Sequence, residues 1–235
     1  MSRRIDLSLK LPSRAHNNAA RSDRRLVPMG KRARIGGTAL RGPYLPPENW
    51  YEPKKDFGGK YRVIVQSAGN GYRHVVSAAD VRNRLAQLPE WMIKPLQVVQ
   101  LSRMTKKKQS APCYGMQWGN AIYLYPIEVS LVESFNHPPQ PAHKIEAAMF
   151  GATWEHLRGG QWKLVWNEAA IRDFYLNNVL IHELGHILDN RNTSYRDRER
   201  FAEWFALEMG YKPTRRAELA KRALAKYAPL ANDGA

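Results

Sequence analysis

A pair of histidines with a glutamate between them is the part of this sequence best suited to chemistry. These are His182, Glu183 and His186 in the segment His-Glu-Leu-Gly-His. On an α-helix, residues i and i+4 lie about 40° apart around the axis, so both imidazoles face one side. Zinc favours neutral imidazole nitrogens that converge in this way. Glu183 lies about 100° away, where its carboxylate could reach a water on the metal without ligating the metal. The spacing predicts a zinc site with Glu183 as general base.

Two glutamates in the next segment could complete this site. No histidine follows His186, so a later residue cannot supply a third imidazole. Glu199 and Glu203 lie four residues apart, on one face of an expected helix. Catalytic zinc takes three protein ligands and keeps a fourth position open. We expect Glu199 to be the third ligand and Glu203 to accept the spare N–H of a zinc-bound imidazole. The opposite assignment, with Glu203 as ligand, stays open, and Asp189 is a further candidate acceptor.

The elements that must position these residues are helices with one apolar face. Leu180 and Leu184 lie on the side of the expected helix opposite the histidines, where they can hold it against a core. Asn167 is expected to cap this helix, which runs from about 168 to 190. A second helix is expected at about 196–209, closed by Gly210, and a third at about 214–227. The short link between the first two predicts a helix pair that brings Glu199 alongside the histidines.

The first half of the chain reads mainly as short strands. A hairpin is expected where two apolar segments flank a glycine-containing turn at 67–71. A helix capped by Ser77 follows, and a mixed helical stretch is expected from about 141 to Arg158. The segment 106–112 is expected to be a loop. The further strands are expected at 96–101, 121–125 and 161–166, and the strand at 121–125 is a candidate sheet edge for pairing with an extended substrate. The predicted class is α+β, with a small mixed or antiparallel sheet before the helices.

The positive charge is concentrated at the ends of the chain. The whole sequence carries a net charge of +16, and residues 1–41 hold 11 Lys or Arg against 2 Asp, a net +9. No aromatic residue precedes Tyr44. We therefore expect residues 1–43 to form a disordered basic arm and residues 44–235 to form one domain. The arm could bind nucleic acid or another polyanion, or it could act only as a solubilising tail.

Composition excludes several classes of protein. No apolar run approaches the roughly 18 residues that a transmembrane helix needs. The basic N-terminus lacks the apolar stretch of a secretory signal, so we expect a cytoplasmic protein, with leaderless export left open. Cys113 is the only cysteine, which excludes an intramolecular disulfide and a zinc site of several cysteines. Cys113 itself is interpreted as a bystander.

The spacing of these residues resembles that of a known family. The pattern His182-Glu-x-Gly-His-x-x-Asp189, followed by Glu199-x-Phe-Ala-Glu203, is similar to the gluzincin metallopeptidases. Within them it looks most like the family of the anthrax lethal factor catalytic domain and the compact minigluzincins. The resemblance covers only about residues 178–209, and the link before Glu199 is shorter than in the lethal factor family. It implies a zincin-like fold with a thermolysin-like active-site helix pair.

The resemblance also implies an activity, the zinc-dependent hydrolysis of peptide bonds in a protein or peptide substrate, and we expect an endopeptidase. Peptidases of this kind often use a tyrosine or histidine to stabilise the oxyanion, which makes Tyr195 the first candidate. The upstream histidines 137, 143 and 156 are weaker candidates. The alternative hypothesis is a nucleic-acid-associated protein whose metal site is structural or serves a protease linked to DNA. Glu183 argues against a purely structural site, which would be closed by four ligands.

Overall fold

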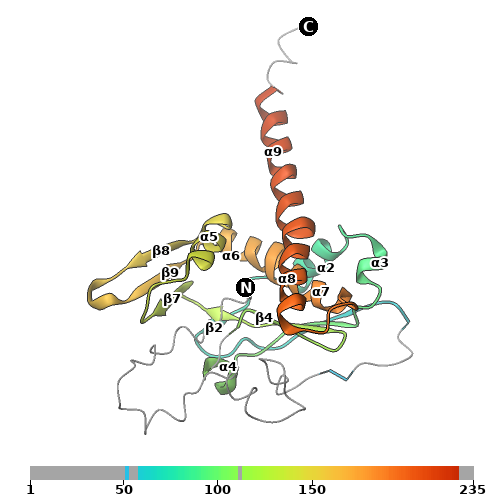
Figure 1. Cartoon of the computed structure of the whole chain (residues 1–235), viewed down its shortest axis with the longest axis horizontal. Helices are drawn as coiled ribbons and strands as arrows, with labels where there is room; N and C mark the ends of the chain where they lie inside the picture. The colour runs from blue at the N-terminus through green and yellow to red at the C-terminus, as the bar shows by residue number, and fades with distance from the viewer. Residues whose placement is uncertain (1–50, 53–57, 111–112, 228–235) are drawn as a thin grey trace.

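The computed structural model describes residues 51–52, 58–110 and 113–227, and its α+β architecture agrees with the predicted class (Figure 1). The expected basic arm lies outside the described residues. The strands are β1 (Arg62–Val65), β2 (Tyr72–Arg73), β3 (Val98–Leu101), β4 (Gly115–Trp118), β5 (Ala121–Leu124), β6 (Ile127–Glu128), β7 (Val132–Phe135), β8 (Thr153–His156) and β9 (Trp162–Val165).

Helices lie between these strands and after the last of them. The α-helices are α2 (Ala78–Leu85), α3 (Glu90–Ile93), α4 (Lys106–Ser110), α5 (Pro141–Met149), α6 (Glu168–Phe174), α7 (Leu180–Leu188), α8 (Tyr195–Ala206) and α9 (Lys212–Tyr227). The π-helical turns are η5 (Tyr175–Val179) and η6 (Leu207–Tyr211), and η4 (Arg158–Gly160) is a 3₁₀ turn. Within the described part of the chain, no helix is both long and apolar enough to cross a membrane.

The main sheet has the strand order β1-β3-β5-β4. Strands β1, β3 and β5 run parallel, and β4 pairs antiparallel with β5. Every residue of β3 and β5 is buried, as expected for central strands. The strand at 121–125 was expected to be a sheet edge, but it lies inside the sheet between β3 and β4. The edge next to it is β4, a strand that the sequence analysis did not predict.

The expected hairpin around residues 67–71 is wrong. Instead of pairing with β2, β1 pairs in parallel with β3, and β2 pairs with β6. Between β1 and β3 the chain forms α2, which begins with a capping box between Ser77 and Asp80. Parallel strands need a crossover connection that brings the chain back to the end of the sheet where the first strand began, and such a connection usually contains a helix. The glycine turn at 67–71 thus leads toward a crossover helix.

Two further expectations fail for local reasons. The helical stretch expected up to Arg158 ends at Met149, because Gly151 takes a φ of +82° there and the chain continues as β8. Strand β8 forms a second antiparallel sheet with β9 and β7. The segment expected as a loop from residue 106 begins with the short helix α4. The expected strands at 96–101, 121–125 and 161–166 are confirmed as β3, β5 and β9.

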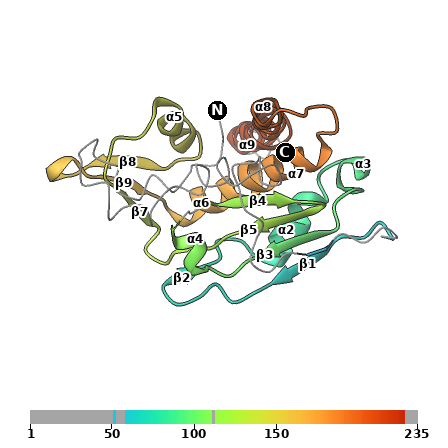
Figure 2. The ribbon, with the colours of Figure 1, turned by 60° about the horizontal axis from the view of Figure 1, so that its bottom comes forward.

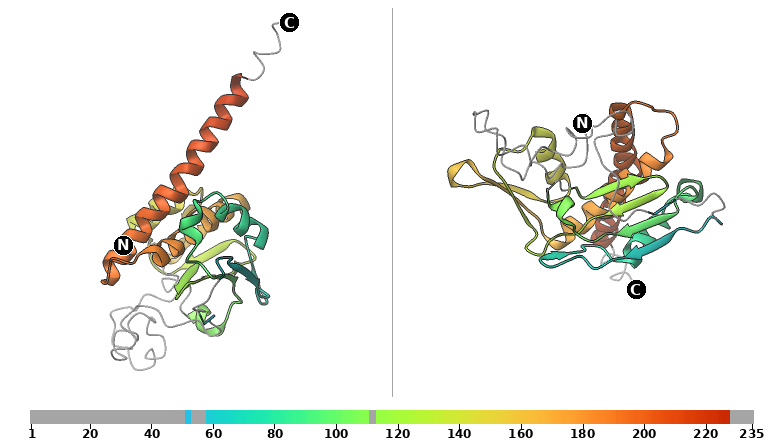
Figure 3. Two further views of the ribbon diagram at one scale, coloured as in Figure 1. Left: turned by 90° about the vertical axis from the view of Figure 1, so that its right-hand side faces the viewer. Right: turned by 90° about the horizontal axis from the view of Figure 1, so that it is seen from below.

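Gly210 was expected to end a helix, but the structure shows that the helix continues through it. Helix α8 continues through η6 into α9, which extends away from the rest of the molecule (Figure 3). A side chain at 210 would place its Cβ 2.0 Å from the carbonyl oxygen of Asn177 in η5. Glycine is needed at this position because the two π-helical turns pack closely together. Buried Arg84 of α2 joins the same turns, donating to Asn177 Oδ1 at 2.5 Å and to the Met209 carbonyl at 2.6 Å.

Helix α7 lies against the main sheet, on β4 and β5 (Figure 2). The apolar side of the helical segment α6–η5–α7 forms much of the core through Phe174, Leu180 and Leu184, which are fully buried. This agrees with the predicted orientation of the helix. Its apolar side is held in the core, so its other side can present polar groups to α8.

Candidate metal centre

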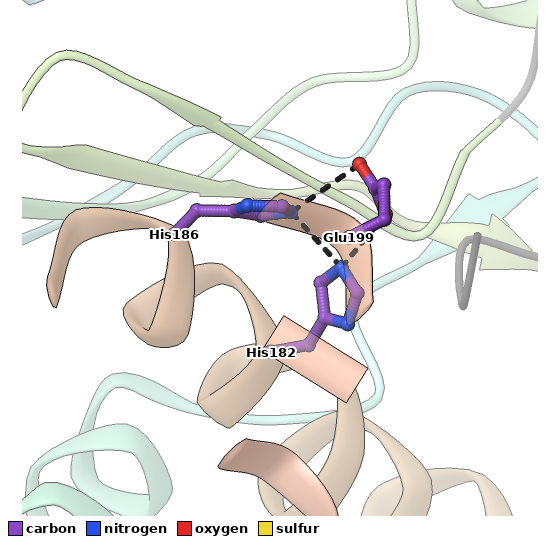
Figure 4. A group of neighbouring side chains, drawn as sticks. All are labelled: His182, His186 and Glu199. Atoms are coloured by element: carbon purple, nitrogen blue, oxygen red, sulfur yellow. Dashed lines mark hydrogen bonds and ion pairs between the residues drawn. The ribbon is translucent and has the colours of Figure 1, made fainter. Parts of the chain in front are cut away.

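Three side chains from the helix pair α7 and α8 converge on one point (Figure 4). The Nε2 atoms of His182 and His186 lie 3.1 Å apart. Glu199 Oε2 lies 3.4 Å from His182 Nε2, and Glu199 Oε1 lies 3.4 Å from His186 Nε2. All three side chains are buried. This is the grouping that the spacing of the residues predicted.

These separations fit a tetrahedral zinc ion. With zinc–ligand bonds of about 2.05 Å, neighbouring ligand atoms in a tetrahedron lie about 3.3 Å apart. The two Nε2 atoms are 3.1 Å apart, close to that value, and each of them has one Glu199 oxygen at 3.4 Å. Two imidazoles and one carboxylate are also the donor set of known catalytic zinc sites. The donors thus fit the metal in both type and spacing.

Burial favours the neutral form of His182. Desolvation lowers its pKa from 6.5 to about 4, against the opposing effect of its hydrogen bond to Glu199. Only a neutral imidazole has a nitrogen lone pair free for a metal. The other ring nitrogen, Nδ1, is buried and has no hydrogen-bond partner among the described residues. No acceptor of the kind expected from Glu203 or Asp189 therefore meets His182 in this structure.

Close packing between α7 and α8 fixes the three donors. At Gly185, between the two histidines on α7, a Cβ would lie 3.1 Å from the Ala202 α-carbon and 3.2 Å from the Phe205 side chain on α8. At the end of α7, Arg198 donates to the His186 carbonyl at 3.1 Å. Neither contact was expected from the sequence. The glycine inside the histidine segment was the available signal for a close helix approach.

Glu183 occupies a different side of α7 from the two histidines. It is buried, and its side chain lies against the first residue of the edge strand β4. A Cβ at Gly115 would be 3.1 Å from Glu183 Cγ and 3.2 Å from its Oε1. The role of Gly115 was not expected, since a lone glycine before three ordinary residues gives no clear signal for a strand. The expected base thus lies beside a sheet edge and outside the group of three donors.

The remaining expected site residues are placed around this centre with other contacts. Asp189 accepts hydrogen bonds from the backbone N–H groups of Arg191 and Asn192, so it shapes the turn between α7 and α8. Tyr195 is the first residue of α8 and is 38% exposed. Glu203 is half-buried on α8, one turn beyond Glu199, and lies outside the group of three.

The three upstream histidines expected as weaker candidates also lie outside the group of three donors. The ring of His156 packs on Trp162, with 4.8 Å between ring centroids. His143 is buried in α5, and His137 Nδ1 lies 3.1 Å from the Pro138 carbonyl oxygen. Within the described ranges, His182, His186 and Glu199 form the one group of this kind.

Comparison of the chain with protein-family models, with curated proteins and with solved structures finds no match. The assignment of a function therefore depends on the geometry of the site and on the chemistry of its residues.

Proposed function

We propose that this protein is a zinc-dependent peptidase that hydrolyses peptide bonds in a protein or peptide substrate, in the manner of the gluzincins. The observation that carries the proposal is the convergence of two imidazole nitrogens and one carboxylate within 3.1–3.4 Å, with Glu183 buried next to them in sequence and beside a sheet edge. The donor set supports a metal, and the adjacent carboxylate supports a hydrolytic use of it.

His182, His186 and Glu199 would hold the zinc, through the two Nε2 atoms and the carboxylate. When bound, zinc would lower the pKa of a coordinated water to about 7 and polarise the carbonyl of the substrate. Glu183 would accept the proton of the attacking water and pass it to the leaving amine. Its position on α7, outside the group of three, suits it to act as the base and not as a ligand.

The edge strand β4 supplies a surface for an extended substrate. Among the described strands, β4 pairs with β5 alone, so its other side carries backbone groups that can bond to an added strand. Gly115 begins this strand, and its α-carbon lies against Glu183. A peptide that pairs with β4 would therefore pass close to the proposed base. This strand takes the role expected for residues 121–125.

Two measurements on the full chain test the proposal. Metal analysis is expected to find one zinc per chain, and digestion of an unbiased peptide library is expected to give defined cleavage products. Glu183→Gln should retain zinc and lose cleavage by a factor of about 10² or more, since the base is removed and the ligands remain. The matched control is Glu90→Gln, an exposed glutamate at the start of α3, which should cleave normally. Cleavage by Glu183→Gln at the normal rate would contradict the proposed role of Glu183.

A further inference from the structure

A pocket of about 460 Å³ lies away from the metal centre, between residues 69–72 and 103–109. These two segments follow β1 and β3. The two strands run parallel, so their carboxyl ends lie at the same end of the main sheet. Figure 2 shows β2 and α4, which carry part of the pocket wall, near this one end of the sheet. Ligands of parallel sheets commonly bind beyond the carboxyl ends of the strands, where the loops after them form a crevice. No residue of α7 or α8 lines the pocket.

Hydrogen bonds between the two segments fix the walls of this pocket. Met104 N donates to the Ala68 carbonyl at 2.9 Å, and Arg103 N donates to Gln66 Oε1 at 3.0 Å. Gly69 faces Met104 with a φ of +101°, a backbone conformation that other residues rarely adopt. The pocket is therefore held open by defined contacts between two loops and is not a chance gap between them.

The lining of the pocket is cationic and rich in hydrogen-bond donors. Arg103 and Lys106 line it, and none of the described residues that line it is a carboxylate. The guanidinium of Arg103 is exposed and has no hydrogen bond or ion pair with any described residue. The neutral polar side chains in the lining are those of Asn70, Tyr72, Thr105 and Gln109.

Thr105 contributes a hydroxyl group to the lining. Its Oγ1 accepts from Lys108 N at 3.3 Å, which leaves its O–H free to donate. The adjacent Lys108 does not compete for the same ligand, because it is buried and donates to Cys113 Sγ at 3.2 Å. The charges in the pocket thus come from Arg103 and Lys106, and the neutral donors come from both walls.

We propose that this pocket binds a phosphate-bearing anion through Arg103 and Lys106. A planar guanidinium and an ammonium group on one wall, with neutral donors around them, match the several acceptor oxygens of a phosphate group. The volume is within the range of small-molecule pockets and admits a ligand of the size of a nucleotide. The phosphate could belong to a free phosphate ester or to a nucleic-acid backbone. This inference does not rest on the proposed peptidase activity.

Titration calorimetry on the full chain, at low ionic strength and in a phosphate-free buffer, tests this site. The probes are inorganic phosphate, adenosine monophosphate, adenosine and a ten-nucleotide single strand. Adenosine monophosphate is expected to bind, and adenosine is not. Arg103→Gln should weaken this binding about tenfold or more, and Lys106→Gln should weaken it several-fold, because each removes a charged donor. The control is Lys94→Gln, an exposed charge outside the pocket, which should bind normally.

The outcomes separate the two sources of phosphate. Binding of inorganic phosphate or adenosine monophosphate that depends on Arg103 supports a site for a free phosphate ester. Binding of the single strand alone, again dependent on Arg103, supports a site for a nucleic-acid backbone. Binding that is equal in Arg103→Gln and the unmodified chain would overturn the proposal, and so would the absence of binding by every phosphate-bearing probe at millimolar concentration.

Discussion

The side chain of Glu183 lies directly against the α-carbon of Gly115, so that a methyl group at 115 would lie 3.2 Å from Glu183 Oε1 and 2.5 Å from Val179 Cγ1. This relationship joins the helix that carries the metal centre to the edge strand of the sheet. It explains why β4 begins with a glycine, since a glycine ordinarily weakens a strand and is found where another group approaches closely.

Gly115→Ala is therefore expected to displace Glu183 and to reduce peptide cleavage more than zinc content. The added methyl group should also destabilise the fold by about 1–3 kcal/mol, because it overpacks a buried contact. Zinc analysis, thermal unfolding and cleavage assays on the same preparation measure the three effects. Gly58→Ala is the control, since nothing lies within 4 Å of a Cβ there. Normal cleavage by Gly115→Ala would show that the exact position of Glu183 is unimportant.

The glycines that allow close helix packing should differ in their tolerance of a side chain. A Cβ at 185 would meet its nearest neighbour at 3.1 Å, whereas a Cβ at 210 would lie 2.0 Å from a backbone oxygen. The nearest atom is a backbone atom at both positions, so the much shorter approach at 210 decides which substitution costs more. Gly210→Ala is expected to cost about 3 kcal/mol or more of unfolding free energy, and Gly185→Ala less. Denaturant titration of both variants measures this order, and the reverse order would contradict the packing described for η5 and η6.

Arg198 should stabilise the helix pair and thereby the zinc site. It donates to the last carbonyl of the histidine segment, that of His186, from the facing helix α8. Arg198→Gln is expected to lower unfolding free energy by about 1–2 kcal/mol and to weaken zinc binding several-fold, since the two helices would be held less firmly. The control is Arg200→Gln, whose side chain is 64% exposed and pairs only at 3.7 Å with Asp197. Equal zinc affinity in both variants would exclude this role of Arg198.

The stability of the metal-free protein should depend on the protonation of His182. Burial lowers its pKa in the folded chain from the ordinary 6.5 to about 4, so the unfolded chain binds the proton more readily. Above pH 6.5 the imidazole is neutral in both the folded and the unfolded chain, so its protonation does not affect stability there. Stability is expected to fall as the pH drops from 6.5 toward 4, by up to about 3 kcal/mol from this group. Chemical denaturation of the chelated protein across this range, compared with His182→Gln, measures the contribution. An identical pH dependence in the two proteins would contradict it.

The candidate site could be predicted from sequence because its geometry is local. The spacing of His182 and His186 on one helix fixes their separation, and a short link limits where Glu199 can lie. The capping residues Ser77 and Asn167 are also confirmed, because a cap needs only a side chain and the next three residues.

The parts that could not be predicted depend on contacts between distant segments. Whether β1 pairs with the next strand or with the one after it is decided by the packing of α2, and no pattern within residues 61–76 records that. Gly210 was predicted as a helix end because glycine is common there. Its actual role depends on Asn177, which is distant in sequence and near in space. The edge position of β4 depends on the order of the whole sheet.

The most direct test of the metal centre is zinc stoichiometry in the full chain and in two glutamate variants. After removal of metal and readdition of zinc, the unmodified chain is expected to bind one ion tightly. Glu199→Gln should weaken that binding by a factor of about 10² or more, because it removes a charged ligand, and Glu203→Gln should weaken it much less. The predicted result is one zinc per chain that is lost with Glu199. Failure of the unmodified chain to bind zinc, or equal binding by Glu199→Gln, would contradict the account.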